Sequence, residues 1–364
     1  MNKIILLLLA VFIVGCQSDK VANTTNLLEI HIINVQQGDA TLVIGPNGTT
    51  LLIDGGDTGR GKDTVFPYLK RLGIEKSIDY MLNTHRHADH LGGLDEVIDA
   101  GLDVRRGIWA NGSDNTDTEA NRDFLSAATR TTAKSAQAIL HGQVVDLGNG
   151  AKATAVAASG NILGTTTPFT VTNENDKSVV LLIQYGLFDY ILSGDLGGGD
   201  DDKDCTKRTT DQKNMESILV NALTGGVKPL LTSTGVEAMM VPHHGSESST
   251  NSDYMNKMSP GVAVISVGAG QGGEFEHPRK DIVERVLMAE AACITAKPAL
   301  VLQTDEGDPI GTDTSKKGFV VGDIVIKTNG VTTFQVSGSG RIREGSPDER
   351  VKAGIASPLS FPLE

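Results

Sequence analysis

The chain has 364 residues, of which 39% are hydrophobic and 42 are glycine, a composition typical of a globular, loop-rich protein and not of a disordered one. Its 32 lysines and arginines against 45 aspartates and glutamates give a formal net charge of -13, which disfavours unassisted binding of polyanions such as DNA. The length fits one large domain or two small ones.

The N-terminus has the pattern of a secretory signal. Lys3 precedes an apolar run from Ile4 to Val14, which is too short to span a bilayer as a retained helix. The ending Ile13-Val14-Gly15-Cys16 resembles the lipobox of bacterial lipoproteins, in which the cysteine is acylated. We therefore expect a lipoprotein signal peptide over residues 1–15, a tether over 16–27, and an exported protein held in the bacterial cell envelope by a lipid on Cys16. The alternative is an ordinary signal peptide with an incidental cysteine.

The first part of the folded region predicts a three-stranded antiparallel meander over residues 28–35, 40–44 and 49–53. Gly45-Pro46-Asn47-Gly48 marks a hairpin between the second and third strands. A helix over 65–72, a strand over 79–83 and a helix over 94–100 follow.

The remaining pattern predicts an α/β fold. Helices separate the later strands, which favours two mixed β-sheets with helices on their outer faces. One folded domain is expected over 28–340, with a polar, loose tail over 341–364. The further strands are expected at 107–109, 143–147, 152–158, 178–185, 188–192, 236–241, 262–267, 294–295, 300–304, 324–327 and 331–336, and the further helices at 118–130, 214–223, 252–258 and 281–292.

Two other stretches leave alternatives open. The acidic, glycine-rich segment 197–211 is interpreted as a surface insertion, because its oxygen ligands lack the alternating spacing of a calcium loop. Cys205 and Cys293 can pair in an exported protein, or both can be free.

Four potential metal ligands lie within six residues, after the strand at 79–83. The stretch reads Thr84-His85-Arg86-His87-Ala88-Asp89-His90 and is followed by a glycine step. His85 and His87 can hold one ion, and Asp89 and His90 a second. Imidazoles with a carboxylate suit zinc, or iron or manganese as alternatives, and a site without cysteine is typical of an open centre that keeps a position for water. The competing interpretation is a solvated loop that happens to hold three histidines.

Other polar residues also follow apolar strands. Asp54, Asp195 and the pair His243-His244 each come directly or closely after one, and His277 ends a loop after another. Functional groups collected at strand ends predict a cleft at one edge of a layered fold.

These motifs, in this order, resemble the metallo-β-lactamase fold superfamily. More narrowly, they resemble the soluble hydrolase domain of the ComEC/Rec2 competence proteins and similar secreted hydrolases, over roughly residues 28 to 336. The resemblance implies a four-layer αββα sandwich. It is carried by Val35-Gln36-Gln37-Gly38-Asp39-Ala40, Leu51-Leu52-Ile53-Asp54-Gly55-Gly56, the histidine cluster with Leu91-Gly92-Gly93, Asn175-Asp176-Lys177-Ser178-Val179-Val180, Leu192-Ser193-Gly194-Asp195, Val241-Pro242-His243-His244-Gly245-Ser246 and His277-Pro278.

The resemblance also implies roles for single residues. Asp195 would bridge the two ions, and Asp54 would orient a ligand histidine, although a turn aspartate is an alternative for Asp54. His277 is assigned to the second ion, and His243 and His244 are expected to polarise the substrate or protonate the leaving group, unless one of them is a ligand. The first ion lacks its usual third histidine, because residues 173–176 read Asn-Glu-Asn-Asp.

The expected activity is a metal-activated water acting on a phosphoester or phosphodiester bond, with Asp89 orienting the water. The expected substrate is a small-molecule or cell-surface phosphoester, with nucleic acid disfavoured by the net charge. Lactone or β-lactam hydrolysis is the enzymatic alternative. The non-enzymatic alternative is a metal-binding surface lipoprotein.

Overall fold

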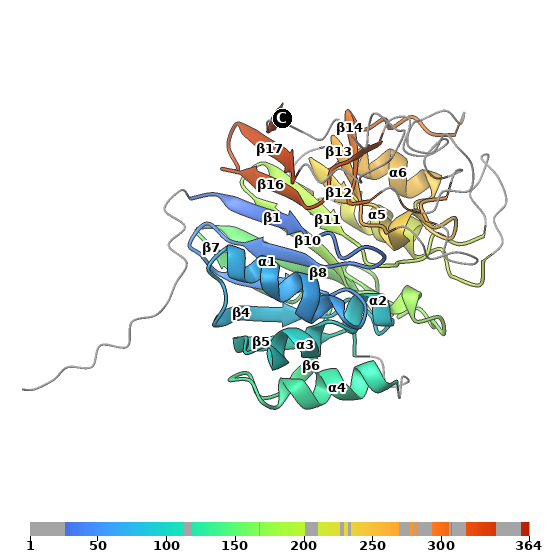
Figure 1. Cartoon of the computed structure of the whole chain (residues 1–364). Helices are drawn as coiled ribbons and strands as arrows, with labels where there is room; N and C mark the ends of the chain where they lie inside the picture. Colours follow the sequence, from blue (N-terminus) through green and yellow to red (C-terminus); the bar gives the residue numbers. More distant parts are fainter. Residues whose placement is uncertain are drawn as a thin grey trace, which may run out of the picture.

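The computed structural model describes residues 26–112, 118–166, 168–200, 210–225, 229–231, 234–268, 277–279, 282, 293–305, 307, 318–339 and 358–363. In these ranges the chain forms two nine-stranded β-sheets with helices around them (Figure 1). No helix in the same ranges is long and apolar enough to cross a membrane.

The first sheet joins the N-terminal strands to the last strands of the chain. Its members are β1 (Leu28–Ile32), β2 (Thr41–Ile44), β3 (Thr50–Ile53), β4 (Ser77–Leu82), β5 (Asp103–Ala110), β6 (Ala136–Ala138), β16 (Ile324–Thr328), β17 (Thr333–Gly338) and β18 (Leu359–Pro362). They are ordered β18-β17-β16-β1-β2-β3-β4-β5-β6. The predicted meander is confirmed, because β1, β2 and β3 pair antiparallel, whereas β3 to β6 pair in parallel.

The second sheet is built from the middle of the chain. Its members are β7 (Val144–Gly148), β8 (Ala151–Ala158), β9 (Asn161–Ile162), β10 (Val180–Tyr185), β11 (Phe188–Leu192), β12 (Ala238–Met240), β13 (Val262–Ile265), β14 (Leu300–Gln303) and β15 (Gly318–Val320). The order is β15-β14-β13-β12-β11-β10-β8-β7, with β9 paired to β8, and β11 to β15 are parallel. Both sheets are therefore mixed, as predicted.

The described helices, apart from η2, lie in the connections between parallel strands. They are η1 (Gly61–Val65), α1 (Phe66–Arg71), α2 (Ala88–Leu91), α3 (Leu94–Asp99), α4 (Glu119–Ala128), η2 (Asn175–Lys177), α5 (Met215–Thr224), η3 (Pro242–Gly245) and α6 (Ser252–Met258). The sequence specifies α4 and α6 locally. Thr118 and Asn251 cap their first turns through the backbone N–H groups of Asn121 and Tyr254, and apolar residues then recur on one face.

Three hydrophobic clusters define four layers. The central cluster takes one face of each sheet, for example Leu28, Ile30 and Ile32 of β1 with Leu181 and Ile183 of β10. The outer faces pack against α1, α3 and α4 on the first sheet and against α5 and α6 on the second. Because side chains alternate across a strand, apolar residues on both faces mean that each sheet is covered on both sides. The αββα sandwich is thus confirmed.

Some expected elements differ from the structure. Residues 294–295, expected as a strand, are irregular, and 359–362, expected in a loose tail, form β18. The ring of Phe361 stacks on Phe334 at 5.1 Å between centroids, so an aromatic contact anchors this last strand. The expected leader (1–15), most of the tether (16–27) and the helix at 281–292 fall outside the described residues, apart from 26–27 and 282.

Candidate metal centre

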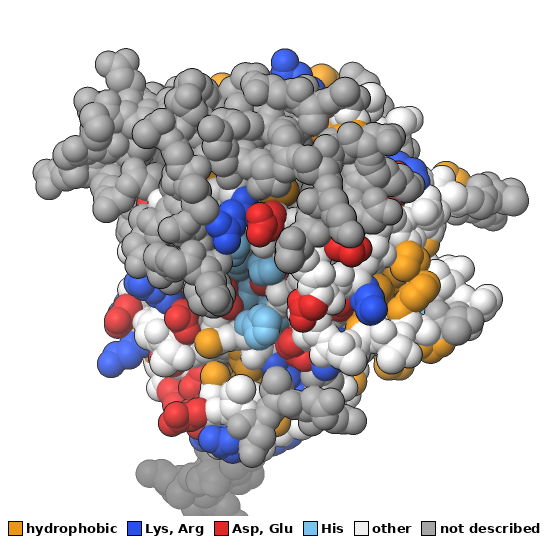
Figure 2. Space-filling model, turned by 90° about the vertical axis from the view of Figure 1, so that its right-hand side faces the viewer, with side chains coloured by type: hydrophobic (Ala, Val, Ile, Leu, Met, Phe, Trp, Pro, Cys, Tyr) orange, Lys and Arg blue, Asp and Glu red, His pale blue; other side chains and the backbone are white. Residues whose placement is uncertain are grey.

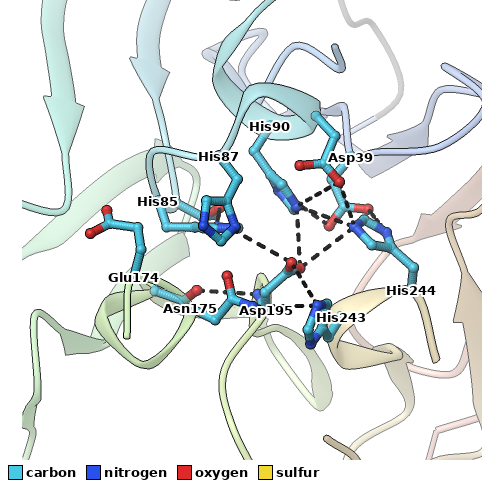
Figure 3. A network of polar contacts seen from close by, with 12 residues as sticks. Asp39, His85, His87, His90, Glu174, Asn175, Asp195, His243 and His244 are labelled. Carbon is cyan, nitrogen blue, oxygen red and sulfur yellow. Dashed lines mark hydrogen bonds and ion pairs between the residues drawn. The ribbon is translucent and has the colours of Figure 1, made fainter. Parts of the chain in front are cut away.

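The two sheets bring the predicted polar residues to one edge. Asp54 follows β3 and the stretch 85–90 follows β4, its parallel neighbour in the first sheet. Asp195 follows β11 and the pair at 243–244 follows β12, its parallel neighbour in the second sheet. Parallel neighbours end at the same edge, and the sheets face each other, so the side chains converge (Figure 3).

The backbone is unusual at two of these points. Asp54 has a φ of +57°, and His243 and His244 have φ values of +52° and +53°. Left-handed backbone is uncommon for residues other than glycine and marks functional positions when the surroundings enforce it. At His243 and His244 it turns two consecutive imidazoles toward Asp195 from one short loop.

Hydrogen bonds fix the rings of His90 and His244 through Nδ1. His90 Nδ1 lies 2.9 Å from Asp54 Oδ2, and His244 Nδ1 lies 2.9 Å from the backbone oxygen of Ser266. Since both partners are acceptors, each Nδ1 carries the proton that is donated. Each Nε2 is then available to bind a metal ion.

The rings of His85 and His243 are held in the same way. His85 Nδ1 lies 3.2 Å from Thr84 Oγ1, and His243 Nδ1 lies 2.9 Å from Ser248 Oγ. All four histidines therefore have Nδ1 engaged by the protein and Nε2 turned toward the centre of the site. This is the arrangement that metal-binding histidines need.

Asp195 divides the four histidines into two pairs. Its Oδ1 lies 3.2 Å from His90 Nε2 and 3.6 Å from His244 Nε2. Its Oδ2 lies 3.6 Å from His85 Nε2 and 3.5 Å from His243 Nε2. One carboxylate oxygen thus faces each pair, which is the geometry of a bridging ligand.

Asp89 and His87 complete the two halves. Asp89 Oδ2 lies 3.3 Å from His244 Nε2 and 3.9 Å from His90 Nε2, and the ligand atoms of these three residues lie within 4.8 Å of one another. His87 Nδ1 lies 3.2 Å from His85 Nε2. His85, His90 and Asp195 form a second group of three with equally close ligand atoms.

Asp54 lies behind His90, fully buried, and accepts hydrogen bonds at both oxygens. Oδ1 accepts from Asn83 Nδ2 at 3.1 Å and from the Thr84 backbone N–H at 2.7 Å. Oδ2 accepts from Thr84 Oγ1 at 2.6 Å and from His90 Nδ1 at 2.9 Å. The structure thus places Asp54 where it can orient His90, the position that was expected for it.

Nearby carboxylates shift the pKa values of His90 and His244. Burial alone would lower the pKa of His90, but Asp195 and Asp89 together raise the pKa of His90 well above its usual value. In the same way, Asp195 and Asp39 outweigh burial and raise the pKa of His244. A cation bound beside His90 and His244 would balance the negative charge of Asp195, Asp89 and Asp39.

Asp195 has the opposite shift. Burial alone would raise the pKa of Asp195, but His243, His90, His244 and His85 together hold it well below its usual range. Its Oδ1 is buried without a hydrogen-bond donor among the described residues. An ionised, buried oxygen that faces histidine Nε2 atoms fits a bound divalent cation, and the nitrogen and oxygen donor set suits zinc, manganese or iron.

A cavity of about 970 Å³ opens onto these residues. Figure 2 shows histidine side chains at the bottom of this hollow. Asp57, Asp211 and Glu247 lie on its exposed parts. Among its described lining residues, Arg279 is the single residue that is either lysine or arginine. The site is therefore accessible to a small molecule.

His277 lies in this cavity but in none of the close ligand groups found among the described residues. The place expected for it, beside Asp89 and His90, is taken by His244. The structure therefore brings His244, one of the two residues expected as catalytic neighbours or as a ligand, into a close ligand group. His243 Nε2 faces Asp195 Oδ2 at 3.5 Å but belongs to none of these groups. The structure leaves His277 beside them, with its ring centroid 5.6 Å from that of His243 and 6.2 Å from that of His244.

Three further residues reach the site without having been assigned a role from the sequence. Asp39 Oδ1 lies 3.5 Å from His244 Nδ1, Ser248 orients His243, and Asn175 Nδ2 lies 3.3 Å from His243 Nε2. Asp39 and Asn175 belong to the motifs that carry the family resemblance, so the sequence could have indicated that these two residues lie at the site.

Comparison with known proteins agrees with the architecture. The model of the metallo-β-lactamase superfamily matches residues 33–207. The chain is 23% identical over 272 residues to ComE operon protein 3 of Bacillus subtilis, covering 70% of this chain and 30% of that protein. It is 25% identical over 263 residues to Recombination protein 2 of Haemophilus influenzae, covering 71% of this chain and 26% of that protein. The match therefore spans less than a third of the length of either relative.

Among solved structures, the metallo-β-lactamase fold protein YhfI from Bacillus subtilis is 10% identical, with a TM-score of 0.42, and the match covers 78% of this chain and 97% of that one. Residues 33–207 of the protein thus match the metallo-β-lactamase superfamily, and the chain resembles the ComEC/Rec2 proteins.

Proposed function

We propose that the protein is a two-metal hydrolase that cleaves phosphoester or phosphodiester bonds. The observation that carries the proposal is the division of four histidines by Asp195, with one carboxylate oxygen facing each pair. The first ion would be held by His85, His87, His243 and Asp195, and the second by Asp89, His90, His244 and Asp195. His243 then fills the place of the third histidine that residues 173–176 lack.

Two such ions supply an activated water and stabilise the charge on the attacked and leaving oxygens. The protein residues fix the orientation of the groups around them. Asp89 is the most exposed of the proposed ligand carboxylates, with 28% of its side chain accessible, and it lines the cavity. It is therefore placed to accept a hydrogen bond from the attacking water. Zinc suits the histidine-rich donor set best, with manganese or iron as the alternatives.

The cavity supports a compact substrate. Apart from the proposed ligands, its described lining carries Asp57, Asp211 and Glu247 against Arg279, so it has little positive charge for a polyanion. Together with the net charge of -13, this favours a small or surface-linked phosphoester over duplex DNA.

We also propose that the protein acts in the cell envelope, anchored by a lipid on Cys16. Cys293 forms a disulfide bond, and disulfides persist in oxidising compartments outside the cytoplasm. Its partner cysteine lies outside the described residues. Metabolic labelling with a fatty acid tests the anchor: label should enter the wild-type protein and not Cys16→Ala, and labelling of both or neither would contradict it.

The activity is tested with purified protein and bis(p-nitrophenyl) phosphate, supplied with zinc or manganese. Asp89→Ala and His87→Ala should lose hydrolysis by 100-fold or more, about the cost of removing an essential group. His141→Ala is the matched control, because His141 is exposed. Full activity in Asp89→Ala, or turnover of lactones or β-lactams but of no phosphoester, would overturn the proposed function.

A further inference from the structure

His277 differs from the four converging histidines in how it is held. Each of those four has Nδ1 engaged by a protein group. Nδ1 of His277 is buried, since only 4% of the residue is exposed, and it has no hydrogen-bond partner among the residues that the structure describes. Metal-binding histidines almost always have their second nitrogen held, so His277 lacks the support expected of a ligand.

The backbone holds His277 beside the centre and not within it. Arg279 N donates to the Gly245 backbone oxygen at 2.9 Å, directly after the pair at 243–244. A Cβ added at Gly245 would lie 2.7 Å from Pro278 Cβ, and one added at Gly307 would lie 2.3 Å from the His277 backbone oxygen. The segment is thus packed tightly on two sides, and both contacts require glycine.

The ring of His277 nevertheless faces the site. It is tilted by 58° against the ring of His243 and lies nearly parallel, at 29°, to the ring of His244. It lines the cavity together with Arg279, whose guanidinium is the kind of group that binds phosphate oxygens. An imidazole ring carries at least one N–H donor whether it is neutral or protonated, so His277 can donate to such an oxygen as well.

We propose that His277 is a substrate-contacting residue that hydrogen-bonds a phosphoryl oxygen in the cavity, and that it is not a metal ligand. The inference rests on the proposed hydrolase function. It assigns to His277 the substrate-side role that the sequence suggested for His243 and His244, and it gives those two residues to the ions.

The test compares His277→Ala, His277→Gln and His244→Ala by metal content, thermal unfolding and the kinetics of bis(p-nitrophenyl) phosphate hydrolysis. His277→Ala should keep the wild-type metal content and lose about 100-fold in kcat/KM, the size of effect seen when one donor to a reacting oxygen is removed. Because Nδ1 is buried, the donor is Nε2. His277→Gln should recover about tenfold of that loss, because its amide places a donor near the position of Nε2. His244→Ala should lose about one equivalent of metal.

Loss of a metal equivalent in His277→Ala or His277→Gln would make His277 a ligand and overturn the inference. Wild-type kcat/KM in His277→Ala, or no recovery in a folded His277→Gln, would also overturn it. If His277→Ala does not fold, metal content and kcat/KM of His277→Gln decide. A wild-type protein without metal or without phosphoesterase activity would instead refute the proposed function, so the two failures are distinguishable.

Discussion

Replacing Asp54 by asparagine should weaken the second metal site without removing any ligand. Both oxygens of Asp54 accept two hydrogen bonds each, from Asn83 and Thr84 at Oδ1 and from Thr84 and His90 at Oδ2. An asparagine side chain has one NH2 group, which must face two of these donors. At the Oδ1 position it would oppose the Thr84 backbone N–H, which cannot rotate.

The less costly choice places the NH2 group beside His90. His90 Nδ1 must then give up its proton, which moves to Nε2 and blocks the lone pair needed for the ion. Loss of such an orienting group typically costs 10- to 100-fold in metal affinity, or about 1.4 to 2.7 kcal/mol.

Chelator competition with purified Asp54→Asn measures this directly. The affinity of the second site should fall by that factor, and Asp63→Asn, which removes an exposed carboxylate of η1, should match the wild type. Wild-type affinity for both ions in Asp54→Asn would refute the reasoning, as would an equal loss in Asp63→Asn.

Four further outcomes are expected. Gly38→Ala should lose both activity and stability, because its Cβ would lie 2.1 Å from the Asp89 backbone oxygen at a φ of +119°. The control is Gly73→Ala, at a φ of +75° with open space around it, which should lower the free energy of unfolding by only about 1 kcal/mol. Equal effects of the two changes on thermal unfolding would argue against the contact with Asp89. Ser248→Ala should weaken the first metal site about tenfold in a chelator titration by releasing His243 Nδ1, while exposed Ser135→Ala should not, and unchanged affinity would deny Ser248 this role. Burial raises the pKa of Asp176 from 3.8 to about 6, so the folded protein binds this proton more tightly than the unfolded chain and wild-type stability declines as the pH rises through this window. The Tm of Asp176→Asn relative to the wild type should therefore increase between about pH 4 and pH 6 and stay level above it, and a constant difference would contradict the shift. Removing metal with a chelator should lower the Tm. The free energy of unfolding should fall by about 2.7 kcal/mol for an ion that had been present at 100 times its Kd, and an unchanged Tm would mean that the folded state does not bind the ions.

Much of the fold could be predicted because apolar strands alternate with amphipathic helices and with clear turn residues. The hairpin at Gly45-Pro46-Asn47-Gly48 and the helix Ser252–Met258 are specified by local sequence and were found where expected. The last strand, Leu359–Pro362, could not be foreseen, because its partner β17 and the aromatic contact with Phe334 come from tertiary structure.

The site was predictable in its membership but not in the roles of its late histidines. Sequence places Asp54, Asp89 and Asp195 after strands, and strand order brings them together. Whether His244 or His277 faces the second pair depends on the left-handed backbone at His243 and His244 and on the hydrogen bond to Ser266. Neither is encoded in a pattern of residue types, so the sequence could assign His277 to the second ion while leaving open that His243 or His244 is a ligand.

The most direct test of the two-metal account is the metal content of purified wild-type protein beside that of Asp195→Ala. Asp195 offers one oxygen to each histidine pair, so its removal should affect both ions at once. The account predicts about two equivalents of transition metal in the wild type and less than about one in Asp195→Ala. A wild-type protein with less than about half an equivalent, or an Asp195→Ala variant that keeps both ions, would contradict it.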